Sequence, residues 1–177
     1  MANFEIALKN ALSYEGGHVN DPDDIGGETY KGISRRYHPM WEGWGYIDVG
    51  DYVGADLYVY QYYLNNHWNV MCGHGFRSQE IANELLEMCI HLGHKRCHVV
   101  LQEGLNIFNN RQKRWEDIKV DGLIGKKTIS ALDKADNCNR SHMIAKYLNC
   151  EQGHMYKKSM EKRETNEKYA VGWFKRT

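Results

Sequence analysis

The sequence predicts an α+β protein in which helices predominate. Apolar residues recur at intervals of three and four in several stretches of the 177-residue chain, which is the pattern of helices that bury one face. Residues 15–33 lack that spacing and are rich in glycine and aspartate, which favour turns. A short extended piece at 118–120 runs into the turn signal Asp121-Gly122. We therefore expect packed helices with a small amount of extended structure between them.

The first helix is predicted from Phe4 toward Glu15. One stripe of this helix carries its apolar residues, Phe4, Leu8, Ala11 and Leu12. Glu15 continues the stripe, so its carboxylate should face packed surface, where desolvation and the carbonyl end of the helix raise its pKa. A neutral glutamate can donate a proton, which makes Glu15 the candidate general acid. The alternative is that Gly16 and Gly17 cap the helix and that Glu15 is a solvated residue of its last turn.

Two capped helices are predicted in the middle of the chain. After a loop at 40–50 that is rich in Trp and Gly, Asp51 caps a helix that extends to about residue 68. Ser78 caps the next helix, which Gly93 ends. The faces expected to be buried are Val53, Leu57, Tyr60 and Leu64 in the first, and Ile81, Leu85, Cys89 and Leu92 in the second.

Three more helices are predicted after Gly93. The first carries Cys97, Leu101, Leu105 and Phe108 on one face. A polar connection at 109–119 leads to the extended piece at 118–120, and a short helix then runs from Gly125 to about residue 135. A long helix covers 141–164, before a tail that ends at 172–174.

The zero formal charge of the chain conceals two halves of opposite sign. Residues 1–90 carry 5 basic and 13 acidic residues, a formal charge of −8, whereas residues 91–177 carry 18 basic and 10 acidic residues, a formal charge of +8. A basic half can attract an anionic polymer, and cell-wall polymers and nucleic acids both qualify. The alternative is that these charges solvate helix faces. At this length we expect one compact unit with two lobes, 1–92 and 93–177.

Cysteine and histidine spacing predicts neither disulfides nor a metal. The five cysteines are odd in number and include no Cys-x-x-Cys pair, which argues against a disulfide framework. Possible zinc ligands cluster at Cys89, His91, His94, Cys97 and His98. We interpret Cys89 and Cys97 as small core residues, because the cluster has no standard ligand spacing. The acidic run at 21–24 fails the EF-hand pattern, so we predict no metal and no cofactor.

The stretch from 15 to 33, EGGHVNDPDDIGGETYKGI, resembles the active-site motif of glycoside hydrolase family 108. That family contains N-acetylmuramidases of phage and bacterial origin that cleave peptidoglycan, some of them described as secretion activators. The positions that match are Glu15, Gly16, Gly17, Asn20, Asp21, Pro22, Gly26, Gly27, Thr29, Gly32 and Ile33. The resemblance implies that Glu15 is the catalytic acid and that no cofactor is needed.

The order of glutamate, aspartate, threonine and Gly-Ile is also similar to that of phage-type lysozymes. The similarity implies a lysozyme-like fold with a small β-hairpin beside the catalytic helix. It makes Asp24 the candidate second carboxylate and Thr29 the candidate group that orients the attacking water. Asp21 and Asp23 remain alternatives to Asp24, and all three aspartates flank Pro22 as ordinary turn formers do.

Aromatic side chains concentrate in the acidic half, where sugar rings can stack on them. Trp41 and Trp44 are candidates for sugar contact because they lie in a predicted loop, where a core position is less automatic. Asn20 and Tyr30, within the motif, are further candidates for substrate binding. The alternative is that the aromatic residues fill the core.

A second resemblance covers residues 100–132. The segments LQEGLNI and VDGLIGKKTISAL resemble the predicted peptidoglycan-binding region that is attached to this glycosidase family. The matched positions are Leu101, Gln102, Asp121, Gly122, Ile124, Gly125, Thr128 and Leu132. Because Asp, Gly and Thr at a helix start are also turn and capping residues, we interpret this motif as structural.

Together these observations predict an N-acetylmuramidase that hydrolyses the β-1,4 bond between N-acetylmuramic acid and N-acetylglucosamine. Its expected partner is the glycan strand of peptidoglycan, and we expect a monomer that binds no nucleic acid. The start, MANFEIALKN, does not resemble a signal peptide, and no stretch is apolar enough for a membrane span. We therefore expect synthesis in the cytoplasm and action on the wall after release. The rivals are a non-catalytic wall-binding or secretion-regulating module, and a nucleic-acid-binding protein, for which we find no motif.

Overall fold

The computed structural model describes residues 1–13, 16–20 and 27–177. Its helices are α1 (Phe4–Leu12), α2 (Gly43–Asp48), α3 (Tyr52–Tyr63), α4 (Gln79–Leu92), α5 (His94–Phe108), α6 (Lys126–Asn137), α7 (Ser141–Lys162) and α8 (Ala170–Phe174). The strands are β1 (His18–Asn20), β2 (Glu28–Tyr30) and β3 (Ile33–Ser34), which form one antiparallel sheet in the order β1-β2-β3. The predicted class, mainly helical α+β with a small hairpin after the first helix, is confirmed.

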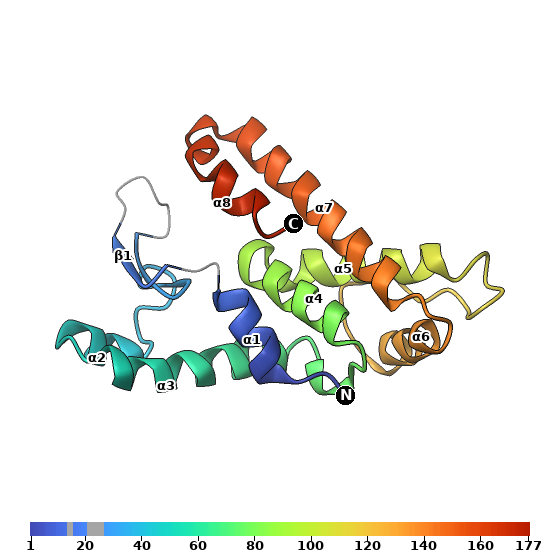
Figure 1. Ribbon diagram of the computed structural model, residues 1–177, viewed down its shortest axis with the longest axis horizontal. Coiled ribbons are helices and arrows are strands. Elements are labelled where there is room, and N and C mark those ends of the chain that lie inside the picture. The colour runs from blue at the N-terminus through green and yellow to red at the C-terminus, as the bar shows by residue number, and fades with distance from the viewer. Residues whose placement is uncertain (14–15, 21–26) are drawn as a thin grey trace.

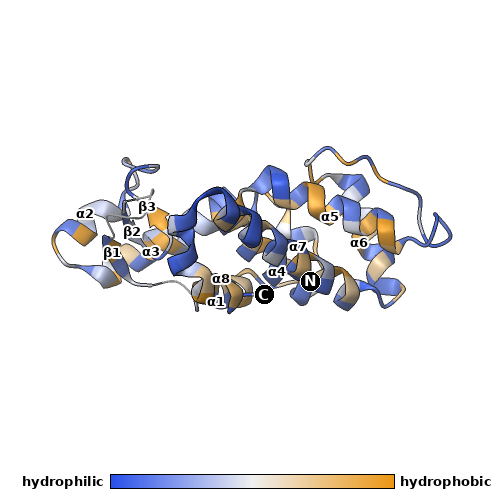
Figure 2. Cartoon of the chain, turned by 90° about the horizontal axis from the view of Figure 1, so that it is seen from above, coloured by the Kyte–Doolittle hydropathy of each residue, from blue (hydrophilic) through white to orange (hydrophobic). Residues whose placement is uncertain are grey.

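The molecule is elongated, with the sheet at one end and α6 at the other (Figures 1 and 2). Helices α2 and α3 lie beside the sheet, α4 packs against α1, α5 and α7, and α8 folds back along α7 (Figure 1). A single hydrophobic cluster runs from Phe4 in α1 to Leu148 in α7. Among the described residues, no helix is both long and apolar enough to cross a membrane. The two predicted lobes, 1–92 and 93–177, stay a prediction.

The two predicted caps, Asp51 and Ser78, are confirmed, and Asn3 caps α1 in the same way. The side chains of Asn3, Asp51 and Ser78 accept hydrogen bonds from backbone N–H groups three residues later, at 3.0, 2.9 and 3.2 Å. Such caps satisfy donors that a helix start leaves without an internal partner. Gly93 separates α4 from α5 with φ +83°, a conformation that side chains with a Cβ rarely adopt.

Two predictions in the aromatic region are wrong. The loop expected at 40–50 contains the helix α2, in which Trp44 and Ile47 are buried one turn apart despite two neighbouring glycines. The face expected to be buried in α3 is mostly exposed, with Val53 83% and Leu57 70% accessible. Instead α3 buries Ala55, Val59 and Tyr63. Apolar side chains lie all round α3, so spacing alone does not reveal which face meets the core.

Two features of the second half go beyond what the sequence predicts. The extended piece at 118–120 pairs with no strand among the described residues, because the Asn106 side chain satisfies both backbone groups of Ile118, at 2.8 and 2.9 Å. The tail after α7 is helical, through the 3₁₀ turn Glu164–Tyr169 and α8. It folds back so that Trp173 packs on Tyr156, with ring centroids 5.1 Å apart.

Candidate active site

The first helix leads directly into the region where the catalytic groups are predicted. Helix α1 buries Phe4, Leu8 and Ala11 of the predicted stripe and also Ala7, whereas Leu12, its last residue, is only partly buried. Glu15 follows two residues after Ser13, but it lies outside the described residues, as do Asp21, Asp23 and Asp24. Their predicted roles, and the raised pKa expected for Glu15, therefore stay predictions.

The sheet fixes which of the remaining candidates share a face. Val19 of β1 and Ser34 of β3 are both paired with Thr29 of β2, so these three residues lie on one face. Asn20 is paired with Glu28, and Tyr30 lies two residues along the same strand, so these side chains belong to the opposite face. The structure therefore separates Thr29 from Asn20 and Tyr30.

A series of connected polar side chains holds the sheet, and we did not predict it from the sequence. One oxygen of Glu28 lies 2.8 Å from His18 Nε2, and the other lies 3.0 Å from Arg35 Nε. Arg35 also donates to Asp48 at 2.5 Å. Glu28 lies two residues before Tyr30, so both side chains lie on one face of β2. That spacing could have drawn attention to Glu28 in the sequence. Both oxygens of Glu28 have a partner, His18 for one and Arg35 for the other, so its carboxylate is held in place at the sheet.

Tyr30 and Lys31 attach the sheet to α3. The Tyr30 hydroxyl donates to Asp56 at 2.9 Å, and Lys31 Nζ lies 2.6 Å from the same carboxylate oxygen. The Tyr63 hydroxyl donates to the Lys31 carbonyl at 2.6 Å. Burial, together with the bond to Asp56, raises the pKa of Tyr30. Tyr30 is 3% exposed, so its side chain serves first as the anchor of the sheet.

The two candidate tryptophans differ in exposure. Trp44 is 4% exposed, its indole N–H donates to the His38 carbonyl at 2.8 Å, and the Arg35 guanidinium lies 4.4 Å from its ring. Trp41 is partly buried, packs edge-on against Trp44 and leaves more of its ring accessible. Sugar contact by either tryptophan, and by Asn20 or Tyr30, stays a prediction, and Trp41 has the better position for it.

A cavity of about 360 Å³ lies between the sheet and the helices, and polar rings surround much of it. Its lining residues are Gly32, Ser34, Tyr37, His38, Tyr62, Tyr63, Asn66, His67, Cys89, Ile90, Gly93 and His94. Burial lowers the pKa of His67 to about 3 and also lowers that of His94, so both rings are neutral near pH 7.

Polar side chains of the second motif form hydrogen bonds with backbone groups of the chain itself. The Gln102 side chain, 1% exposed, accepts from the backbone N–H groups of Asp121 and Gly122 at 3.0 and 2.8 Å, and it donates to the Leu123 carbonyl at 3.0 Å. Asp121 accepts the N–H of Leu123 at 3.0 Å, and Thr128 is 3% exposed. These contacts support the interpretation of the second motif as structural.

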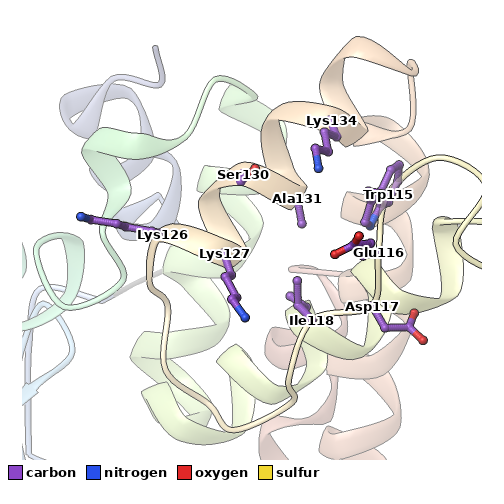
Figure 3. Close-up of a pocket in the computed structure, with 9 residues that line it drawn as sticks. All are labelled: Trp115, Glu116, Asp117, Ile118, Lys126, Lys127, Ser130, Ala131 and Lys134. Carbon is purple, nitrogen blue, oxygen red and sulfur yellow. The ribbon is translucent and has the colours of Figure 1, made fainter.

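A groove of about 240 Å³ opens on the surface of the basic half, between α6 and the segment 115–118. Lys126, Lys127 and Lys134 are among the residues that line this groove, and Lys127 and Lys134 point toward its centre (Figure 3). The Glu116 carboxylate projects into the same space (Figure 3). The groove therefore offers groups of both charges to a ligand.

Comparison with known proteins divides the chain at the junction of α4 and α5. The model of the family Glycosyl hydrolase 108 matches residues 8–93, and the model of the Predicted Peptidoglycan domain matches residues 96–177. No curated protein matches the chain. The solved structure described as that of Brucella abortus SagA is 22% identical and has a TM-score of 0.59. That similarity covers 97% of this chain and 95% of the other, and it shows that the two share a fold.

Proposed function

We propose that this chain, whose N-terminal half belongs to glycosyl hydrolase family 108 and whose C-terminal half is a predicted peptidoglycan domain, is an N-acetylmuramidase. The two matches support a peptidoglycan hydrolase role. The observation that carries the finer proposal is the motif at 15–33, which follows α1 in the chain and includes β1, β2 and the first residue of β3. The bond to be cleaved is the β-1,4 bond between N-acetylmuramic acid and N-acetylglucosamine.

In the proposed reaction Glu15 gives its proton to the glycosidic oxygen as the bond from that oxygen to the sugar carbon breaks. The sugar acquires oxocarbenium character, and water supplies the new oxygen. Asp24 is proposed to stabilise that charge or to take the proton from the water, and Thr29 to orient the water. The distance between the two carboxylates would determine whether the anomeric configuration is retained or inverted.

The basic half is proposed to hold the enzyme on the wall. Its charge of +8 is counted over residues 91–177, nearly the same segment as the predicted peptidoglycan domain. Stem peptides of peptidoglycan carry both carboxylates and amino groups, which suits a groove that presents Lys127, Lys134 and Glu116. The second candidate function, a non-catalytic wall-binding or secretion-regulating module, rests on this half alone.

The test is clearing of purified peptidoglycan by wild type, Glu15→Gln and the control Glu5→Gln, with mass spectrometry of the fragments. Glu5 is exposed in the first turn of α1, so its substitution changes the same charge away from the motif. We expect wild type and Glu5→Gln to release fragments with reducing N-acetylmuramic acid ends. Glu15→Gln should fold and lose about 100-fold or more in rate, as expected for a general acid.

Two outcomes would decide against this proposal. An unchanged rate in Glu15→Gln would discard Glu15 as the acid. If no protein released fragments while all of them bound the wall, the non-catalytic module would be favoured instead.

A further inference from the structure

We propose that Cys89, His94 and His98 form a binding site for a Zn²⁺ ion at the junction of α4 and α5. One thiol and two imidazole nitrogens of these residues lie within 4.8 Å of one another. Thiolate and imidazole are the ligands that Zn²⁺ prefers. The inference does not rest on the proposed hydrolase function.

The local fold explains why these three side chains meet. His94 and His98 are four residues apart in α5 and therefore lie on the same face of that helix. Cys89 belongs to the last turn of α4, and Gly93, with its positive φ, turns the chain so that α5 runs back beside that turn. The spacing of His94 and His98 falls within the range common in zinc sites, which the sequence analysis overlooked.

The hydrogen bonds of the two histidines leave the required nitrogens free. His94 Nε2 bonds to the Asn66 carbonyl at 2.8 Å, and His98 Nδ1 bonds to the Gly122 carbonyl at 3.1 Å. A carbonyl only accepts, so these two nitrogens must carry the protons. In a neutral ring, the other nitrogen then has a lone pair without a proton. Histidines that bind metals are commonly oriented by such a bond from the second nitrogen.

The free nitrogens have no alternative partner. His94 Nδ1 and His98 Nε2 are both buried, and neither has a hydrogen-bond partner in the part of the chain that the structure describes. Buried polar atoms are rarely left in this state, because the lost hydration is not compensated. Cys89 is 1% exposed, so its sulfur is also withdrawn from water. A cation among these three atoms would satisfy both nitrogens.

The three ligand atoms must move slightly closer together to bind Zn²⁺, and the neighbouring cavity leaves room for a fourth ligand. A tetrahedral Zn²⁺ with bonds of about 2.0–2.3 Å holds its ligand atoms about 3.5 Å apart, so the widest separation here must shrink by roughly 1 Å. Cys89 and His94 line the cavity of about 360 Å³ described above, which can admit a solvent ligand. The site would thus have three protein ligands and one open position.

A bound ion would fasten together the two parts that the family matches separate. Cys89 lies in the segment matched by the hydrolase family, which ends at residue 93, whereas His98 lies in the segment matched by the peptidoglycan domain, which begins at residue 96. Through Gly122, His98 is also connected to the Gln102 contacts of the second motif.

The experiment is titration of the reduced, chelator-treated full-length protein with Zn²⁺, followed by calorimetry and by competition with a chromophoric chelator. We expect one ion per chain and a higher melting temperature with Zn²⁺. Substitution by Co²⁺ should give the strong visible bands of a tetrahedral site and a thiolate charge-transfer band in the near ultraviolet. Cys89→Ser and His94→Gln should each weaken Zn²⁺ binding by about 100-fold or more, since even outer partners of metal sites contribute 10- to 100-fold.

Two matched variants control for the loss of any thiol or imidazole. Cys97→Ser removes a buried neighbouring thiol outside the cluster, and His154→Gln removes an exposed imidazole on α7. Both should bind Zn²⁺ as wild type does. Circular dichroism shows whether each variant folds, and the wild-type stoichiometry and Co²⁺ spectrum remain informative if one does not.

Three results would overturn the inference. The first is wild-type protein without saturable Zn²⁺ binding. The second is a Co²⁺ complex without the thiolate band. The third is a Cys89–Cys97 disulfide in protein purified without reductant that also forms in the presence of Zn²⁺, since Cys89 would then not be a ligand.

Discussion

The two motifs of this chain are used by the fold in opposite ways. In the second motif the polar atoms of Gln102 are 1% exposed and bind backbone groups of the same turn. In the first motif the described polar residues, such as Asn20, stand at the surface of a small sheet, where a ligand can reach them. Two stretches that each resemble a family motif can thus be built from buried structural contacts in one case and present polar side chains at the surface in the other. The burial of their polar atoms distinguishes them.

The contrast between the two motifs predicts its largest effect at Gln102, in the second motif. Gln102→Ala would leave the N–H groups of Asp121 and Gly122 buried without an acceptor, at about 1–3 kcal/mol each. We expect the free energy of unfolding to fall by about 4 kcal/mol in urea titrations, with wall clearing per folded molecule unchanged. Glu103→Ala, on the exposed neighbour in α5, is the control. A loss below about 1 kcal/mol would mean that the turn does not depend on Gln102.

The next largest effect is expected at Glu84 of α4. This helix packs against α1, which precedes the first motif, and against α5, which carries Gln102 of the second motif. Burial, followed by the nearby charge of Glu87, raises the pKa of Glu84 from 4.5 to about 7. A carboxyl group that binds its proton more tightly in the folded state destabilises the fold as pH rises from about 4.5 through 7. The shift corresponds to roughly 3 kcal/mol.

Glu84→Gln should remove that pH dependence and make the protein more stable than wild type at pH 8. Unfolding free energies of both proteins at pH 5 and pH 8 measure it, with Glu103→Gln as the exposed counterpart. Parallel pH profiles for wild type and Glu84→Gln would show that Glu84 is ionised in the fold at little cost.

A smaller effect is expected at Asp24, in the first motif. Asp24→Asn should lower the clearing rate by at least about tenfold, which is near the lower limit for groups that assist acid-base catalysis, and should leave the unfolding free energy nearly unchanged. The same measurements on Asp21→Asn and Asp23→Asn compare the alternatives. If the unfolding free energy fell while the rate held, Asp24 would be a turn residue, and the contrast between the motifs would disappear.

The smallest effect is expected in the groove of the basic half. Lys127→Gln combined with Lys134→Gln should weaken wall binding about fivefold at low salt, since exposed charges contribute little each and are screened. The matched variant combines Lys146→Gln with Lys157→Gln, which removes two exposed lysines of α7 that do not line the groove. Equal weakening by that pair would assign the attraction to net charge and not to the groove.

Much of the fold could be predicted because local rules decide it. The caps at Asp51 and Ser78 and the apolar stripes of α1, α4 and α5 depend only on residues close in sequence. The buried face of α3 could not be predicted, because it is chosen by what packs against it. The fold of the last residues onto Tyr156 likewise depends on a partner far away in the chain.

The candidate site shows the same division. The sequence places Thr29 and Tyr30 side by side, so they lie on opposite faces of a strand. Only the register with β1 and β3 shows which residues of those strands share each face. The series of connected polar side chains through Glu28 and Arg35 depends on a contact between neighbouring strands and loops. The Cys89 cluster depends on the turn at Gly93, whose consequence for three side chains cannot be read from spacing.

The contact of Arg176 with α4 affects how the chain folds during its synthesis. The Arg176 guanidinium is 8% exposed in its side chain, lies 3.8 Å from the buried carboxylate of Glu87 and donates to His91 at 2.6 Å, across 85 residues of sequence. A buried carboxylate without a cation is strongly unfavourable. While the ribosome is still adding those residues, Glu87 lacks its contact with the Arg176 guanidinium. The nascent chain should therefore reach its final packing around α4 only after Arg176 has left the exit tunnel.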